Sequence, residues 1–102
     1  MVYFIQAAKS KLIKIGQTAR DVNIRLREMQ TGSPDRLVLL VTLPAKDEKA
    51  FHLRFKRERV HGEWFRPSPS LLTFIRNIES MHWLNSIAQS VGGKPVFEWD
   101  NL

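Results

Sequence analysis

The residues best suited to chemistry lie in two short strand-like segments near the start of the chain. Residues 2–5 contain Tyr3, the only tyrosine in the protein, and residues 14–16 read Lys-Ile-Gly. Segments rich in Val, Ile, Tyr and Phe are typical of strands. If the connecting turn is centred just after Ala8, the two strands form a hairpin in which Tyr3 faces Lys14. A phenol beside an ammonium group suits a phosphodiester-cleaving site, although an ordinary hairpin also explains the pair.

Arg25 is a candidate phosphate ligand because of its place on the helix that is expected to follow. It comes three residues after Val22 and four before Met29, at the border of the apolar stripe. From there its guanidinium group can extend along the sheet towards Tyr3 and Lys14. The forked guanidinium makes paired hydrogen bonds with phosphate oxygens. The alternative is a packed aliphatic stem that carries its charge into water.

Two glutamates are candidate metal ligands. Glu48 starts the helix face that Phe51 is expected to bury, and a carboxylate there suits Mg²⁺, which takes a few oxygen ligands plus water and phosphate. Glu63, in a loop with aromatic neighbours, is the alternative ligand. The ordinary explanations are an acid that complements the helix dipole for Glu48 and a loop carboxylate bound by backbone amides for Glu63. His52 lies one turn after Glu48 as a second polar group.

The surrounding sequence predicts an α+β domain with a three-stranded antiparallel sheet flanked by helices. Three strands are expected, at residues 2–7, 11–16 and 37–43. Three helices are expected, at about residues 21–30, 46–56 and 70–90. The continuous apolar run at 37–43 indicates a buried central strand. Asp21 is a good N-cap for the first helix and Gly32 a good stop.

The predicted domain spans residues 1–91 and is followed by a tail at 92–102. The helix that ends the domain is expected to turn five apolar residues inward: Leu71, Leu72, Ile75, Ile78 and Leu84. The tail contains Phe97 and Trp99, which offer a contact for a protein partner.

Composition limits the classes of protein that the chain can represent. The chain has 102 residues, which suits one domain. It has no cysteine, which excludes disulfides, cysteine nucleophiles and Cys-based zinc sites and fits a cytoplasmic location. We expect no membrane association, because no stretch approaches the roughly 20 apolar residues of a membrane helix and no signal peptide is visible.

The positive charge is concentrated in the first part of the chain. The net charge is +6, and residues 1–59 hold 13 Lys and Arg against 6 Asp and Glu, whereas residues 60–102 hold 3 against 4. This distribution favours a polyanionic partner, of which nucleic acid is the usual one. The candidate contacts to the nucleic-acid backbone are Lys9, Lys11, Arg20, Arg27, Arg54, Lys56, Arg57 and Arg59.

The order of these short motifs resembles the GIY-YIG endonuclease superfamily, most closely its phage and bacterial branch with Lys-Ile-Gly as the second signature. The resemblance covers about residues 2 to 78. It rests on four segments: Val2-Tyr3-Phe4, Lys14-Ile15-Gly16, residues 25–34 and Gly62-Glu63-Trp64-Phe65. It implies a GIY-YIG-like nuclease domain with a three-stranded antiparallel sheet between helices.

The same resemblance implies a DNA endonuclease, a hydrolase that uses one divalent metal ion, Mg²⁺ or Mn²⁺. Tyr3 matches the tyrosine that acts as general base or orients the attacking water. Arg25 matches the arginine that stabilises the phosphate, and Glu48 the glutamate that holds the metal. Lys14 stands where many members have a second tyrosine, and it can bind phosphate or lower the pKa of a neighbouring phenol or water. His52 assists the proton transfer if it reaches Tyr3.

Two other functions remain open on the sequence alone. A catalytically silent module on the same fold would bind DNA or RNA without cutting it, and Lys14 is the residue that favours this alternative. A protein-interaction domain would use the tail. The sequence does not determine the oligomeric state.

Overall fold

The chain begins with the predicted hairpin, but its register differs from the expected one. The structure, a computed structural model, describes residues 1–94. In it β1 (Val2–Ala7) pairs antiparallel with β2 (Ile13–Gln17), and Tyr3 lies opposite Gly16 while Lys14 lies opposite Ile5. The predicted pairing of Tyr3 with Lys14 is therefore wrong by two residues. Because side chains alternate along a strand, a shift of two keeps both residues on the same face, as diagonal neighbours.

The sheet has five antiparallel strands, two more than predicted. Its order is β3-β1-β2-β5-β4. The additional hairpin joins β4 (Arg59–His61) to β5 (Trp64–Phe65) through a turn in which Gly62 has a φ of +53°. All three residues of β4 are exposed. With only three residues, Arg-Val-His, this strand is too short for the apolar alternation by which a sequence indicates a strand.

The apolar strand β3 (Leu37–Leu43) is an edge strand, which corrects the central position predicted for it. Two helices explain its composition. α1 (Val22–Thr31) and α3 (Pro69–Ser90) both pack against β3, and its residues contribute to the cores on both faces of the sheet. A strand covered on both faces carries a continuous apolar run wherever it lies in the sheet.

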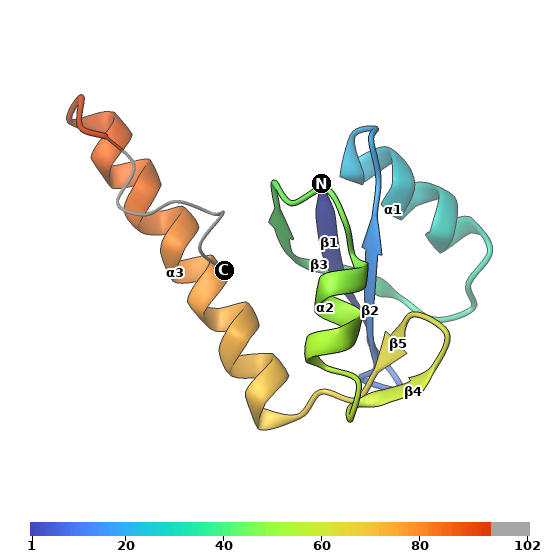
Figure 1. Ribbon diagram of the computed structural model, residues 1–102. Helices are drawn as coiled ribbons and strands as arrows, with labels where there is room; N and C mark the ends of the chain where they lie inside the picture. Colours follow the sequence, from blue (N-terminus) through green and yellow to red (C-terminus); the bar gives the residue numbers. More distant parts are fainter. Residues whose placement is uncertain (95–102) are drawn as a thin grey trace.

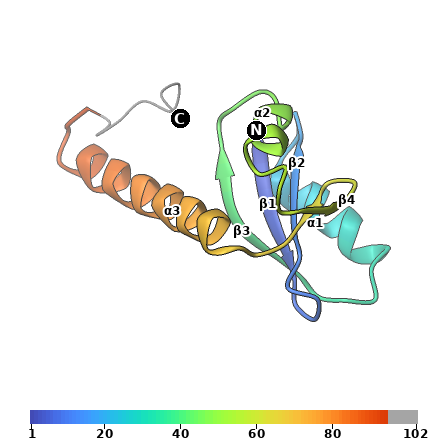
Figure 2. The same ribbon diagram turned by 60° about the horizontal axis from the view of Figure 1, so that its bottom comes forward.

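The helices form one layer on each side of the sheet (Figures 1 and 2). α1 covers the face on which Tyr3 and Ile5 are buried. α2 (Lys49–Arg54) and α3 cover the other face, where rings of Phe4 and Phe51 meet edge to face at 6.0 Å. The strand β1 thus alternates its side chains between two separate cores, and Tyr3 belongs to the α1 side.

Local hydrogen bonds fix where the helices begin. The carboxylate of Asp21 accepts the N–H of Asn23 at 2.8 Å at the start of α1, and Gly32 follows its end, as predicted. The helix α2 is shorter than the predicted 46–56. Its entry is set by Asp47, whose carboxylate accepts the N–H of Lys49 at 2.8 Å. After Arg54 the chain continues through turns into β4, which ends the helix early.

The long helix α3 packs on the sheet mainly with its first half. His82 in the second half still reaches β3, where its Nε2 atom lies 2.6 Å from the carbonyl oxygen of Thr42, and the helix beyond it projects away (Figures 1 and 2). Ile75 and Ile78 are buried as predicted, but Leu72 and Leu84 are 38% and 39% exposed, so the expectation for these two is wrong. No helix within residues 1–94 is long and apolar enough to span a membrane. Most of the predicted tail, with Phe97 and Trp99, lies outside the described residues.

Candidate active site

The phenol ring of Tyr3 lies directly across the backbone of Gly16. Tyr3 is 1% exposed, and a Cβ atom added to Gly16 would come within 2.4 Å of the Tyr3 hydroxyl oxygen and 2.5 Å of Cζ. Only glycine leaves room for the ring there. The role of Gly16 was not predicted, although a glycine inside a strand is a recognised sign that another group approaches closely.

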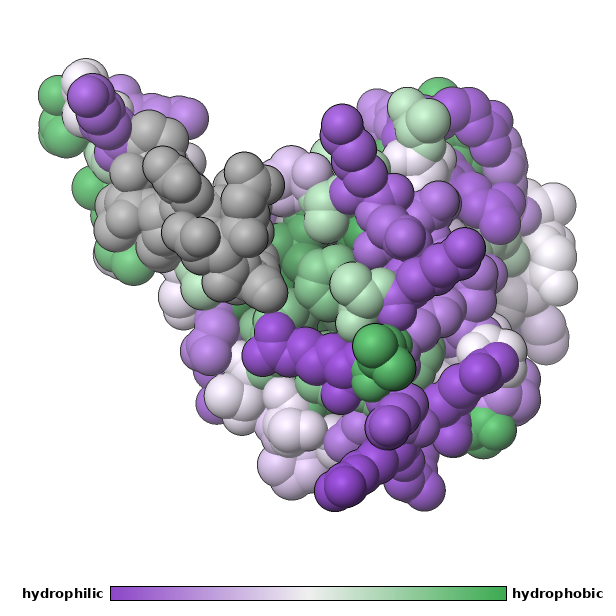
Figure 3. Space-filling model, viewed as in Figure 1, coloured by the Kyte–Doolittle hydropathy of each residue, from purple (hydrophilic) through white to green (hydrophobic). Residues whose placement is uncertain are grey.

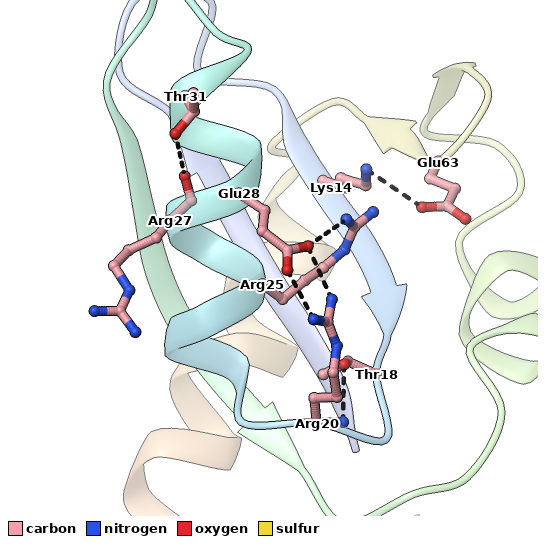
Figure 4. Close-up of polar contacts among 8 residues, drawn as sticks. All are labelled: Lys14, Thr18, Arg20, Arg25, Arg27, Glu28, Thr31 and Glu63. Carbon is pink, nitrogen blue, oxygen red and sulfur yellow. Dashed lines mark hydrogen bonds and ion pairs between the residues drawn. The ribbon is translucent and has the colours of Figure 1, made fainter.

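Arg25 extends from α1 along the sheet to the Tyr3 hydroxyl, as its place beside the apolar stripe predicts. Its guanidinium acts on the hydroxyl both by hydrogen bonding and by charge. Glu28, one turn further along α1, holds Arg25 with an ion pair of 3.4 Å and holds Arg20 with one of 2.8 Å (Figure 4). The hydrogen bond from Arg20, joined by Arg25, lowers the pKa of Glu28. Glu28 was not predicted as a site residue, yet it orients Arg25, the arginine that contacts Tyr3.

Lys14 is engaged by Glu63, the carboxylate on the turn between β4 and β5. The Lys14 Nζ atom lies 3.7 Å from Glu63 Oε2 (Figure 4). The β2–β5 ladder brings the turn here, since Lys14 pairs with Trp64 and the N–H of Ile15 donates to the carbonyl of Glu63 at 3.0 Å. The hairpin missed by the sequence prediction therefore supplies one of the site carboxylates.

The carboxylate of Glu48 is unusual because one of its oxygen atoms, Oε2, is buried and has no hydrogen-bond partner among the described residues. The backbone N–H of Glu48 donates to Gln17 Oε1 at 2.9 Å, which ties the residue to the end of β2. Its charge acts on Tyr3, as does that of Glu63. A buried carboxylate oxygen without a partner is costly and calls for a bound cation or proton.

The donor set fits a hard divalent cation with few protein ligands. Within residues 1–94 no group of three or more His, Cys, Asp or Glu side chains is arranged to hold a metal ion. Mg²⁺ commonly uses one or two carboxylates and completes its octahedron with water and substrate phosphate. Glu48 suits this arrangement better than Glu63, because Lys14 already compensates Glu63.

The family is shown by the sequence match. A model of the T5orf172 domain matches residues 1–86, which include every site residue described above. The chain belongs to the T5orf172 domain family. The T5orf172 domain is a phage-associated, nuclease-like domain. A search of curated proteins and a search of solved structures found no match.

In this T5orf172 domain His52 is attached to β2, the middle strand of the sheet. Its Nε2 atom lies 2.8 Å from the carbonyl oxygen of Ile15, and its ring packs 5.1 Å from that of Phe65. The short strand β5 pairs only with Ile13 and Lys14 of β2, so His52 gives the next carbonyl, that of Ile15, a hydrogen-bond partner. Only Nδ1 is left for proton transfer, and the catalytic role of His52 stays a prediction.

The eight basic residues predicted to follow a nucleic-acid backbone lie in four places in the T5orf172 domain. Arg20 and Arg27 flank the candidate site, although Arg27 points to the opposite side of α1 from Arg25 (Figure 4). Arg54 lies on the other side of the sheet, with its guanidinium 4.3 Å from the ring centre of Phe74. The remaining five occupy the two hairpin regions: Lys9, Lys11, Lys56, Arg57 and Arg59. Their contact with nucleic acid stays a prediction.

The hydroxyl of Tyr3 stays protonated at neutral pH. Burial raises its pKa above the ordinary value of 10.0, and the hydrogen bond and charge of Arg25 oppose this rise only in part. The charges of Glu63 and Glu48 raise the pKa further. Arg25 therefore lowers the pKa of the phenol, but by less than burial raises it.

Titration of the single tyrosine tests this balance directly. We expect the near-ultraviolet tyrosinate absorbance of the folded T5orf172 domain to rise with a midpoint above pH 10.0. Arg25→Ala should move the midpoint up and Glu48→Gln should move it down. Because the unfolded chain loses this proton first, the stability contributed by Tyr3 is complete below pH 10.0 and falls as the pH rises above it. A folded midpoint at or below that of the denatured chain would contradict the assignment.

Proposed function

We propose that this T5orf172 domain is a divalent-metal-dependent DNA endonuclease of the GIY-YIG type. The observation that carries the proposal is the unpartnered, buried Oε2 atom of Glu48 within electrostatic reach of the Tyr3–Arg25 pair. A cation held by the carboxylate, a phenol and a guanidinium are the groups that phosphodiester hydrolysis needs in one place. The family supports the nuclease class, and the site chemistry supports the reaction.

Tyr3 acts in this proposal as an oriented hydroxyl group. The guanidinium of Arg25 can only donate hydrogen bonds, so the phenol oxygen accepts from it. The hydroxyl proton is then directed to another acceptor, such as a phosphate oxygen or the attacking water. Because the phenol is protonated at neutral pH, it positions these groups instead of removing a proton as tyrosinate.

Fixed positive charge supplies the other half of the chemistry. Arg25, held by Glu28, would supply preorganised positive charge to a phosphoryl group, and such charge stabilises a transition state. Lys14 adds a second cation on the same face of the sheet. A Mg²⁺ or Mn²⁺ ion held by Glu48 would serve as Lewis acid and template for the phosphate.

Cleavage of supercoiled plasmid tests the proposal. We expect nicking with Mg²⁺ or Mn²⁺ and none in excess EDTA. Tyr3→Phe and Arg25→Ala should each reduce the rate at least about 10²-fold, the usual loss when a transition-state donor is removed. Arg76→Ala is the matched control, since it removes the same charge from an exposed position on α3, and it should change the rate by less than roughly threefold.

One observation favours the alternative of a silent nucleic-acid-binding module. Lys14, in the place of a second tyrosine, forms an ion pair with a carboxylate of the same site. DNA or RNA binding by the purified protein without cleavage in any divalent metal would establish this alternative. Wild-type rates in both Tyr3→Phe and Arg25→Ala would show that the site is elsewhere.

A further inference from the structure

The helix α3 turns its apolar side chains in two different directions along its length. In its first half the buried residues face the sheet: Leu71, Phe74, Ile75 and Ile78. Four apolar side chains are exposed in its second half and at the residue that follows its end: Trp83 by 63%, Leu84 by 39%, Ile87 by 43% and Val91 by 78%. With 3.6 residues per turn, the centres of these two groups lie roughly 180° apart around the helix. The second group, which we call the outer face of α3, therefore points away from the core of its own domain.

The chemistry of the outer face selects a protein partner. Residues 80–91 contain no Asp, Glu, Lys or Arg, although 25% of the whole chain is charged. A nucleic-acid contact uses basic side chains, and a helix on a membrane surface carries Lys or Arg on its polar face. An uncharged helix with apolar side chains on one side resembles instead the core of a protein interface, where charged residues are depleted.

We propose that the outer face of α3 pairs with the same face of a second copy of the chain. The absence of charge makes the face compatible with itself, so a two-fold symmetric contact has no like charges to bring together. Beyond His82, α3 projects from the rest of the protein (Figures 1 and 2), and apolar surface is visible along it (Figure 3). Two copies can therefore join through this helix while their basic regions stay apart.

The area of the outer face agrees with such a pair. Its four side chains expose on the order of 400 Å² of apolar surface, and each partner of a standard interface contributes about 800 Å², of which somewhat more than half is apolar. Trp83 is the largest anchor, and tryptophan is enriched among residues that dominate interface energies. An interface of this size predicts a reversible dimer.

Sedimentation equilibrium of the full chain tests the proposal over roughly 1–200 μM, where weak interfaces of this size associate. We expect the mass to rise from the 11.9 kDa of one chain towards twice that value. Ile87→Glu should weaken association at least about tenfold, because it buries a charge at the centre of the contact. Gln89→Glu is the matched control, an exposed position on the other side of the same helical turn, and it should associate like the wild type.

Three results would overturn the proposal. One is a mass of a single chain at every concentration, and another is an equal loss in Ile87→Glu and Gln89→Glu when circular dichroism shows both folded. A wild-type monomer that dimerises after Phe97→Ser and Trp99→Ser are combined would also overturn it, and would assign the outer face to residues 95–102 of the same chain. The measurement is of mass alone, so its outcome is independent of nuclease activity.

Discussion

Glu48→Gln is expected to abolish metal-supported cleavage, with a fall of at least about 10³-fold in rate, while leaving the fold intact. The amide keeps the shape of the side chain but removes the charge that a divalent cation requires. The change also relieves a buried carboxylate oxygen that has no partner within the described residues. We therefore expect the free energy of unfolding in EDTA to be no lower than that of the wild type.

Thermal unfolding with and without metal gives a readout separate from activity. An ion that binds only the folded state raises the melting temperature. Mn²⁺ or Mg²⁺ should stabilise the wild type and should not stabilise Glu48→Gln. Glu79→Gln is the matched control, because Glu79 is exposed on α3 and its loss changes the net charge equally. A Glu48→Gln protein that cleaves within about threefold of the wild-type rate would refute Glu48 as the metal ligand. It would not contradict the description of the fold.

Gly16→Ala is expected to have the largest effect on stability of any single methyl group added to this protein. The new Cβ would lie 2.4 Å from the hydroxyl oxygen and 2.8 Å from Cε1 of Tyr3, whose ring is packed on all sides. Either the ring or the strand must move. Overpacking of this kind costs about 1–3 kcal/mol, and it displaces the hydroxyl on which the proposed chemistry depends. We expect a fall of roughly 10 °C in melting temperature together with loss of cleavage.

Two comparisons isolate the cause of that loss. Gly32→Ala adds the same methyl group where the nearest atom is 3.9 Å away, and it should change stability by less than about 0.5 kcal/mol. In a Tyr3→Leu background the atoms that block the Gly16 Cβ are missing, so Gly16→Ala should cost much less there than in the wild type. Equal costs in the two backgrounds would show that the ring is not the obstacle.

The elements that the sequence predicts well are those with a local physical cause. Apolar patterning and the capping residues Asp21 and Gly32 are properties of a few neighbouring residues, and both ends of α1 follow from them. The orientation of Arg25 follows in the same way from its place beside an apolar stripe. These features do not depend on contacts between segments that are distant in the sequence.

The features that were missed depend on how distant segments meet. The first hairpin has no strong turn residue, and its turn places Lys11 at a φ of +66°, so nothing in the sequence centres the turn and the register was wrong. In the β4–β5 hairpin, β4 is exposed and β5 has only two residues, so their apolar pattern is too short to indicate strands. Glu28 and Gln17 support Arg25 and Glu48 only through contacts made in the folded protein.

The internal ion pairs have a consequence for how strongly ionic strength controls binding. Salt weakens nucleic-acid complexes because the contacts release condensed ions from the phosphates, one for each protein charge that replaces them. Arg20 and Lys14 each already have a carboxylate partner. A cation that keeps its carboxylate partner neutralises less of the phosphate charge and displaces fewer ions. The complex should therefore tolerate salt better than the net charge of +6 suggests, and shape and metal coordination should carry more of its affinity.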